Sequence, residues 1–192
     1  VRWGTTTQPT SFDPATVGNA ANRWYLEPIY DTLIDALENG QLVPGLATEW
    51  ALADDAMSLD LTLREGVTFQ DGEPFDADAV VANFEHFRAD DSLLKADLAV
   101  IDSVEVIDPL HVRLHFNRAG GDVPQVLSGF PGMMVSPASI AAGTTSTEPV
   151  GAGPFTINTI TDSSATYDYW DGYWAAETII PRSVEVVLMT DD

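Results

Sequence analysis

The sequence contains no cysteine, which excludes disulfide bonds and metal sites built from thiolates. Basic residues are also few: 8 lysines and arginines stand against 30 aspartates and glutamates, and the formal net charge is −22. Because phosphate groups are bound by basic surfaces, this balance argues against nucleic acids and anionic membranes as partners. The acidic residues are scattered along the chain, so they indicate a solvated acidic surface.

Long apolar runs are absent as well. No stretch approaches the roughly 20 apolar residues of a membrane-spanning helix, and the amino terminus carries no signal peptide. The chain begins at Val1 without an initiator methionine, which favours a trimmed form of a longer protein. Its 192 residues are 45% hydrophobic, which suffices for one or two domains with a substantial core.

The clearest local pattern begins at Ser58. Leu59, Leu61 and Leu63 alternate with polar residues, which predicts a strand with one apolar face. Glycines at 66 and 72 predict turns on either side of a second short strand over 67–69.

A helix is expected to follow, up to Phe87. Asp76 can cap its first turn, and Asp78 places negative charge where the helix dipole favours it. Phe75 and Val80 occupy the two positions of a hydrophobic staple. The two aspartates do not face each other on a helix, so they are not expected to form an acid–base pair.

Hydrophobic periodicity predicts the remaining elements. Strands are expected over 1–7, in hairpins over 104–116 and 156–169, and at 184–189. Helices are expected over 22–36 and 122–127, and a tight turn into a short helix is expected over 42–50. The segment 88–101 is expected to be partly helical, and 141–149 to be a linker.

The histidines do not predict a metal site. His111 and His115 are four residues apart on a predicted strand, too far apart to share a metal ion easily. His86 belongs to a separate predicted helix. The two glycines of 151–153 are not expected to cradle phosphate either, because no lysine follows and Pro154 lacks an amide donor. A chain crossover between domains fits them better.

The string from 61 to 84, L-x-L-R-E-G-V-x-F-x-D-G-x-P-F-x-A-x-x-V-x-x-N-F, resembles the signature of the family 5 extracellular solute-binding proteins. These are the oligopeptide-, dipeptide- and nickel-binding receptors of bacterial ABC importers. Segments at 8–14, 29–33, 42–50, 149–155 and 171–174 are similar to further family segments, in the family's order. Two departures are Ala152, in place of the usual threonine, and Ala175-Ala176, in place of glycines.

The resemblance implies a mixed α/β fold that is part of the first lobe of a periplasmic-binding-protein-like clamshell. Residues 1–39 and 150–192 would form part of the main sheet of that lobe, and 40–149 an inserted β-rich subdomain. Family chains are much longer, so the sequence is expected to be an N-terminal piece without the second lobe. Such a piece is expected to bind solute weakly and to self-associate through exposed sheet edges.

The resemblance also implies a function. The protein would capture a peptide-like or other small solute and deliver it to the membrane permease of an ABC importer. It would be exported to the cell envelope, either free in the periplasm or lipid-anchored on the outer face of the cytoplasmic membrane. Neither catalysis nor a cofactor is implied.

The resemblance places five residues at the solute: Asn19, Arg23, Phe130, Met133 and Met134. Each has a plainer interpretation, since Arg23 can belong to a surface ion pair and the methionines can fill the core.

Two other functions remain open. One is a secreted carbohydrate-active enzyme that uses two of the many carboxylates. The other is a polysaccharide-binding envelope module built on an aromatic cluster, for which a structural corner is the favoured interpretation. The cluster comprises Tyr167, Tyr169, Trp170, Tyr173 and Trp174.

Overall fold

The computed structural model describes residues 1–17, 20–178 and 181–189. The strands are β1 (Arg2–Thr5), β2 (Ile34–Ala36), β3 (Leu42–Pro44), β4 (Ala47–Leu52), β5 (Ser58–Leu63), β6 (Ile101–Asp108), β7 (His111–Phe116), β8 (Phe155–Ile160), β9 (Ser164–Tyr169) and β10 (Ser183–Leu188). The α-helices are α1 (Arg23–Leu26), α2 (Ala77–Phe87), α3 (Val123–Val126) and α4 (Pro137–Ala142), and the short 3-10 helices are η1 (Pro14–Thr16), η2 (Ala20–Asn22), η3 (Phe130–Gly132) and η4 (Ala176–Thr178).

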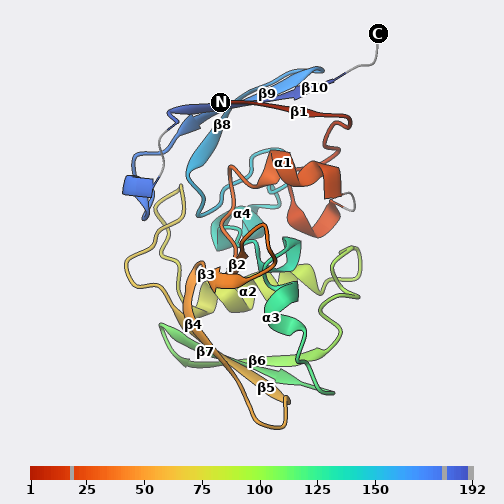
Figure 1. The fold of residues 1–192 in the computed structure, drawn as a ribbon, viewed down its shortest axis with the longest axis vertical. Coiled ribbons are helices and arrows are strands. Elements are labelled where there is room, and N and C mark those ends of the chain that lie inside the picture. The colour runs from red at the N-terminus through yellow and green to blue at the C-terminus, as the bar shows by residue number, and fades with distance from the viewer. Residues whose placement is uncertain (18–19, 179–180, 190–192) are drawn as a thin grey trace.

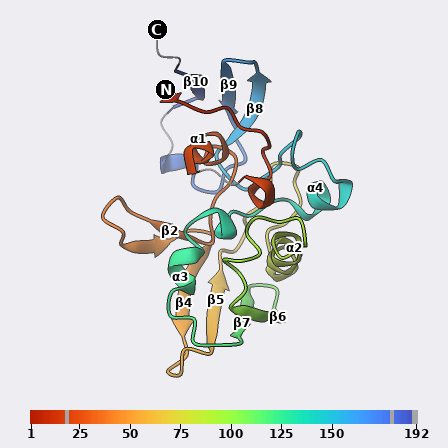
Figure 2. The same ribbon diagram turned by 90° about the vertical axis from the view of Figure 1, so that its right-hand side faces the viewer.

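Two sheets lie at opposite ends of the long axis, with the α-helices between them (Figure 1). One sheet has the strand order β1-β10-β9-β8, and the other has the order β4-β5-β7-β6. The pair β2-β3 is separate, and Figure 2 shows β2 and the turn after it projecting from one side of the molecule. The fold is therefore mixed α/β, as expected from the sequence.

The first sheet joins the two ends of the described chain. β1 pairs with β10 in parallel, with Arg2 opposite Glu185 and Thr5 opposite Leu188. β9 pairs antiparallel with both β10 and β8. The hairpin expected over 156–169 and the strand expected at 184–189 are both present.

The second sheet confirms the pattern around Leu61. Leu59, Leu61 and Leu63 are 0%, 1% and 2% exposed, so all three face the core. β7 pairs antiparallel with both β5 and β6, which confirms the hairpin expected over 104–116. Polar residues cover the opposite face, where Arg113 forms two hydrogen bonds to Asp60.

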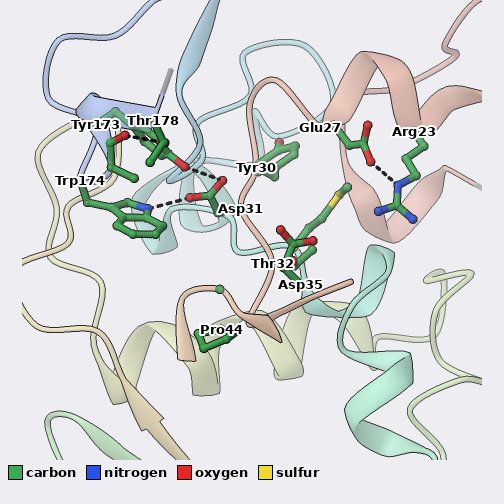
Figure 3. A pocket seen from close by; sticks show the side chains of 13 residues that line it. Arg23, Glu27, Tyr30, Asp31, Thr32, Asp35, Pro44, Tyr173, Trp174 and Thr178 are labelled. Carbon is green, nitrogen blue, oxygen red and sulfur yellow. Dashed lines mark hydrogen bonds and ion pairs between the residues drawn. The ribbon is translucent and has the colours of Figure 1, made fainter. Parts of the chain in front are cut away.

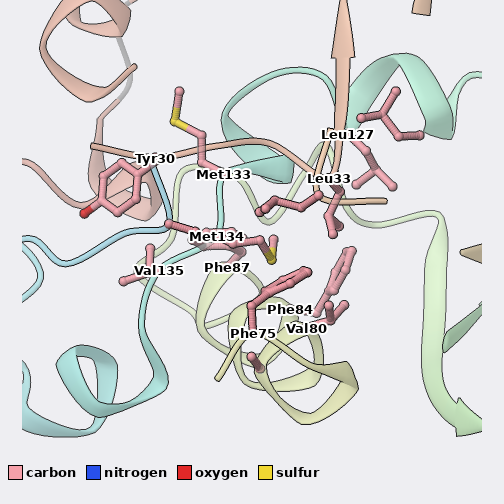
Figure 4. Packing of buried hydrophobic residues seen from close by; sticks show 14 of the residues in the cluster. Tyr30, Leu33, Phe75, Val80, Phe84, Phe87, Leu127, Met133, Met134 and Val135 are labelled. Carbon is pink, nitrogen blue, oxygen red and sulfur yellow. The ribbon is translucent and has the colours of Figure 1, made fainter. Parts of the chain in front are cut away.

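α2 begins where the sequence predicts. The Asp76 carboxylate accepts a hydrogen bond from the Ala79 N–H at 3.0 Å, and Asp78 lies in the first turn. Phe75 and Val80 are both buried. The apolar face of α2 packs into the central core, where Met134 points toward Phe84 (Figure 4).

The helix expected over 22–36 is wrong except at its beginning. α1 ends at Leu26, with Glu27 as its C-cap. Pro28 follows, and because proline has no N–H to donate to the preceding turn, the helix does not continue. Residues 27–29 form a turn, in which the Tyr30 N–H donates to the Leu26 carbonyl at 3.0 Å. The Phe155 N–H donates to the Pro28 carbonyl at 2.9 Å, and the Gly153 N–H donates to the Ile29 carbonyl at 2.8 Å.

Further expectations also differ from the structure, the first of them because sheet pairing overrides local preference. The residues after Leu46 form strand β4 rather than a helix, with Trp50 opposite Leu61 on β5. The second strand expected over 67–69 is reduced to an isolated bridge between Thr68 and Pro74. α4 occupies the start of the segment expected to be a linker.

The chain passes twice between the two sheets, and close backbone contact joins the passages. A Cβ on Gly151 would lie 2.2 Å from the Ile29 carbonyl oxygen, so only glycine permits this approach. The Gln70 amide contacts both passages: Nε2 donates to the carbonyls of Ile29 (3.3 Å), Gly153 (3.1 Å) and Phe155 (2.9 Å), and Oε1 accepts from the Gly151 N–H (3.2 Å). The glycines of 151–153 thus serve a chain crossover. The division into 1–39 with 150–192 and 40–149 stays a proposal.

Within the described ranges, no helix has both the length and the apolar character needed to cross a membrane.

Candidate functional site

A cavity of about 390 Å³ opens between α1, the β2-β3 pair and the segment 173–178. Its volume lies within the range of small-molecule pockets. The lining residues are Arg23, Glu27, Tyr30, Asp31, Thr32, Asp35, Pro44, Gly45, Met133, Tyr173, Trp174, Ala175 and Thr178. They come from four separate parts of the sequence, so the cavity exists only in the folded chain.

Asp31 is fixed at one side of this pocket. Trp174 Nε1 donates a hydrogen bond to Asp31 Oδ2 at 2.7 Å, and the Tyr173 hydroxyl donates to Oδ1 at 3.4 Å. Figure 3 shows both aromatic residues on one side of Asp31, while Arg23 and Glu27 lie across the pocket. The Asp31 carbonyl accepts from the Met134 N–H at 3.1 Å, which holds the backbone as well.

Burial raises the pKa of the Asp31 carboxyl to about 6, and the nearby Asp35 carboxylate adds to this effect. The hydrogen bonds from Trp174 and Tyr173 and the positive charge of Arg64 act in the opposite direction. Asp31 is therefore ionised at neutral pH and becomes protonated in mildly acidic solution. Burial and the negative charge of Asp31 raise the pKa of Tyr173, so the phenol stays protonated and can donate.

The charge of the lining is unbalanced. Arg23 is the only basic side chain among the lining residues, and it is ion-paired with Glu27, the C-cap residue of α1. Asp31 and Asp35 have no basic partner in the lining. The pocket therefore carries an excess of negative charge toward a ligand.

Arg64 does not line the pocket, but it contacts two residues that do, Gly45 and Trp174. Its Nε and Nη2 donate to the Gly45 carbonyl at 3.2 and 3.0 Å. Its guanidinium carbon also lies 4.0 Å from the centroid of the Trp174 ring, a cation–π contact.

The structure brings together only part of the site expected from the sequence. Arg23 and Met133 line the pocket. Met134 is fully buried and points into the core, away from Met133 (Figure 4). Phe130 is partly buried against the core and does not line the pocket. Asn19 lies outside the described residues.

Sequence reasoning missed Asp31, Tyr173 and Trp174. The helix expected over 22–36 includes Asp31, but α1 ends at Leu26. For the two aromatic residues the sequence favours a structural corner. The structure divides that aromatic cluster: Tyr167 is buried and donates to the Tyr25 carbonyl at 3.0 Å, whereas Tyr173 and Trp174 reach the pocket. The signal available in the sequence was the adjacent pair Tyr173 and Trp174, two aromatic side chains that can both donate hydrogen bonds from one turn.

Each histidine contacts one carboxylate: His86 lies 2.8 Å from Asp13, His111 lies 2.8 Å from Asp108, and His115 lies 2.7 Å from Glu105. Over the described part of the chain, no three metal-binding side chains are grouped to hold an ion.

Comparison with known proteins gives consistent matches. The sequence model of the bacterial extracellular solute-binding proteins, family 5 Middle, matches residues 41–192. The glutathione-binding protein GsiB of Salmonella paratyphi A is 28% identical over 170 residues, which are 86% of this chain and 33% of GsiB. The chain thus spans about a third of the length of the curated relatives it matches.

Solved structures agree. An ABC transporter substrate-binding protein from Sinorhizobium meliloti is 31% identical with a TM-score of 0.88, over all of this chain and 39% of that protein. The murein tripeptide binding protein MppA of Escherichia coli is 20% identical with a TM-score of 0.89, over 97% of this chain and 41% of MppA. At this identity, the likeness to MppA shows a shared fold and nothing further.

Proposed function

Because the chain belongs to the family 5 bacterial extracellular solute-binding proteins, we propose that it forms part of the first lobe of a solute receptor for an ABC importer. The receptor captures a small solute or peptide outside the cytoplasm and delivers it to the membrane permease. It acts by binding and carries out no reaction.

The observation that supports this proposal is the pocket around Asp31. A carboxylate held by two aromatic donors forms a fixed recognition group, since the aromatic residues are stiff and the hydrogen bonds define its orientation. In a full clamshell, the second lobe would cover such a pocket by hinge closure. The isolated first lobe is therefore expected to bind solute weakly.

The excess of carboxylates favours a solute with a positively charged group, such as the amino group of a peptide. GsiB is named for glutathione and MppA for a murein tripeptide, and both compounds are suitable first probes. Short peptides with a free amino terminus, each paired with its N-acetylated form, test the charge directly.

The decisive experiment is native mass spectrometry of the full-length protein purified without denaturation, followed by thermal-shift screening of the probes. A bound small molecule supports the receptor. A probe at 100 times its Kd is expected to add about 2.7 kcal/mol of stability. A full-length protein that carries no solute and is stabilised by none of the probes contradicts the proposal.

Asp31→Asn then tests the pocket itself. A neutral amide removes the charge, and the loss of one charged hydrogen bond to the solute corresponds to roughly 1.5–3 kcal/mol, or about 10- to 150-fold weaker binding. Asp97→Asn is the matched control, because Asp97 is exposed and lies outside the pocket. Equal affinities for the two variants contradict the role of Asp31.

We further propose that the protein is exported. It is then either free in the periplasm or held by a lipid anchor on the outer face of the cytoplasmic membrane. The 192-residue chain by itself is proposed to self-associate through the edge strands β1, β8, β4 and β6, each of which is paired on only one side in the described sheets. Sedimentation over a range of concentrations tests this, and a monomer at the highest concentration contradicts it.

A further inference from the structure

Arg64 belongs to the signature string, yet the pocket does not use it directly. It follows β5, and its backbone N–H donates to the Leu46 carbonyl at 2.8 Å. Its guanidinium makes two hydrogen bonds to the Gly45 carbonyl. These contacts fix both ends of the side chain, so the guanidinium has a defined place behind the pocket wall.

That place is against the ring of Trp174. The guanidinium carbon is 4.0 Å from the ring centroid, close enough for a cation–π contact. The indole N–H of the same ring reaches Asp31 Oδ2 at 2.7 Å. A continuous series of contacts therefore runs from the Gly45 carbonyl through Arg64 and Trp174 to Asp31.

The hydrogen bond from Trp174 to Asp31 depends on the orientation of the indole ring. An indole ring donates from a single atom, so a rotation of Trp174 about its side-chain bonds removes the N–H from Asp31. Trp174 lies on a turn after Gly172 and not on a strand or helix. Contacts outside the turn therefore contribute to the order of the ring, and Arg64 supplies one of them.

We propose that Arg64 is a positioning residue of the solute pocket: it holds the Trp174 ring so that the indole N–H keeps the Asp31 carboxylate charged and fixed in orientation. This inference rests on the proposed function for its biological purpose. The physical coupling between Arg64, Trp174 and Asp31 stands without it, and it can be measured with no solute present.

The charged and titratable groups around Asp31 come from every element at the pocket. Asp35 adjoins it on β2, Tyr173 donates to it from the 173–178 turn, and Arg64 lies behind Trp174. The Arg23–Glu27 pair faces it from α1. Removing Arg64 takes away a positive charge and loosens the Trp174 donor, and both changes make the protonated form of Asp31 more favourable.

The test uses the full-length protein labelled with 15N in its tryptophan indoles. The Trp174 resonance is identified by its loss in Trp174→Phe, and it is followed from pH 4.5 to 8.5. In the wild type it is expected to titrate with Asp31, whose pKa is about 6. In Arg64→Met the midpoint is expected to rise and the resonance to move toward that of an indole without a carboxylate partner.

Arg64→Lys keeps the charge but cannot stack flat while donating twice to Gly45, so an intermediate shift is expected. If Arg64→Met does not fold, the lysine variant carries the test alone. Arg113→Met is the control, because it removes an equal charge from the outer sheet face, where Arg113 pairs with Asp60. The control is expected to leave the Trp174 titration unchanged.

A Trp174 resonance and midpoint that are the same in wild type and in the folded Arg64 variants overturn the inference. A failure of every probe to bind the full-length protein contradicts the proposed function instead. Because the titration is measured without solute, the two failures are distinguished.

Discussion

Replacing Asn83 with alanine should remove a buried side chain that pairs two elements. Asn83 is 0% exposed on α2. Its Nδ2 donates to the Val135 carbonyl at 2.8 Å, and its Oδ1 accepts from the Val135 N–H at 2.8 Å. Asn83 thus acts toward Val135 as a neighbouring strand would, satisfying both backbone groups of one buried residue.

The magnitude follows from the groups left without a partner. Each buried polar group deprived of its hydrogen bond costs about 1–3 kcal/mol, and Asn83→Ala deprives two. Alanine regains up to about 0.7 kcal/mol through its higher helix propensity. The net destabilisation is therefore about 1–5 kcal/mol, a large share of the roughly 5–15 kcal/mol that stabilises a typical domain.

Hydrogen exchange at the Val135 amide in the full-length protein measures this directly. Asn83→Ala should speed that exchange, and urea unfolding should occur at a lower midpoint. Asn83→Asp should also destabilise, because a carboxylate cannot donate to the Val135 carbonyl. Glu85→Ala, on the exposed face of the same helix, is the control and should stay within about 0.5 kcal/mol of wild type. Unchanged exchange at Val135 in Asn83→Ala refutes the reasoning.

Two further predictions concern stability. The hydrogen bond to Asp13 raises the pKa of His86, so protonated His86 stabilises the fold fully below its unfolded pKa, and this contribution is lost as the pH rises through the raised folded value. Burial acts to raise the pKa of Asp13, but the hydrogen bonds that its carboxylate accepts outweigh burial, and the pKa is lowered overall. The stabilisation from ionised Asp13 is therefore lost only as the pH falls through that lowered pKa. The melting temperature of the wild type should therefore fall more between pH 5.5 and 8.5 than that of His86→Gln. Equal falls in the two proteins contradict this prediction. Gly151→Ala should destabilise by about 2–3 kcal/mol in urea unfolding, because its Cβ meets the Ile29 carbonyl. Gly121→Ala, whose Cβ meets nothing within 4 Å, should be nearly neutral, and equal effects of the two changes refute the crowding argument.

Elements set by short-range patterns were predictable from the sequence. The alternation around Leu61 and the Asp76 cap depend on residues a few positions apart, and both are found as expected. The α1 error arose because apolar spacing was followed through Pro28, although proline ends the helix there.

The site was less predictable because its members are far apart in the chain. Asp31 and Trp174 are 143 positions apart, and no local pattern joins them. Arg23 was identified through the family resemblance, whereas Met134 was separated from Met133 by the simple fact that neighbouring residues of an extended chain point to opposite sides. The sequence contained both methionines but no means of deciding which one faces the pocket.

The pairing of β1 with β10 has a consequence for synthesis. Arg2 emerges from the ribosome before its partner Glu185, which follows some 180 residues later. At about 5–20 residues per second, the interval is roughly 10–40 s. Throughout that time β1 has no neighbour on the side that β10 will occupy, and such distant pairing closes slowly even once both strands exist. β1 is thus synthesised long before it is paired, and during that interval its open edge can associate with other chains.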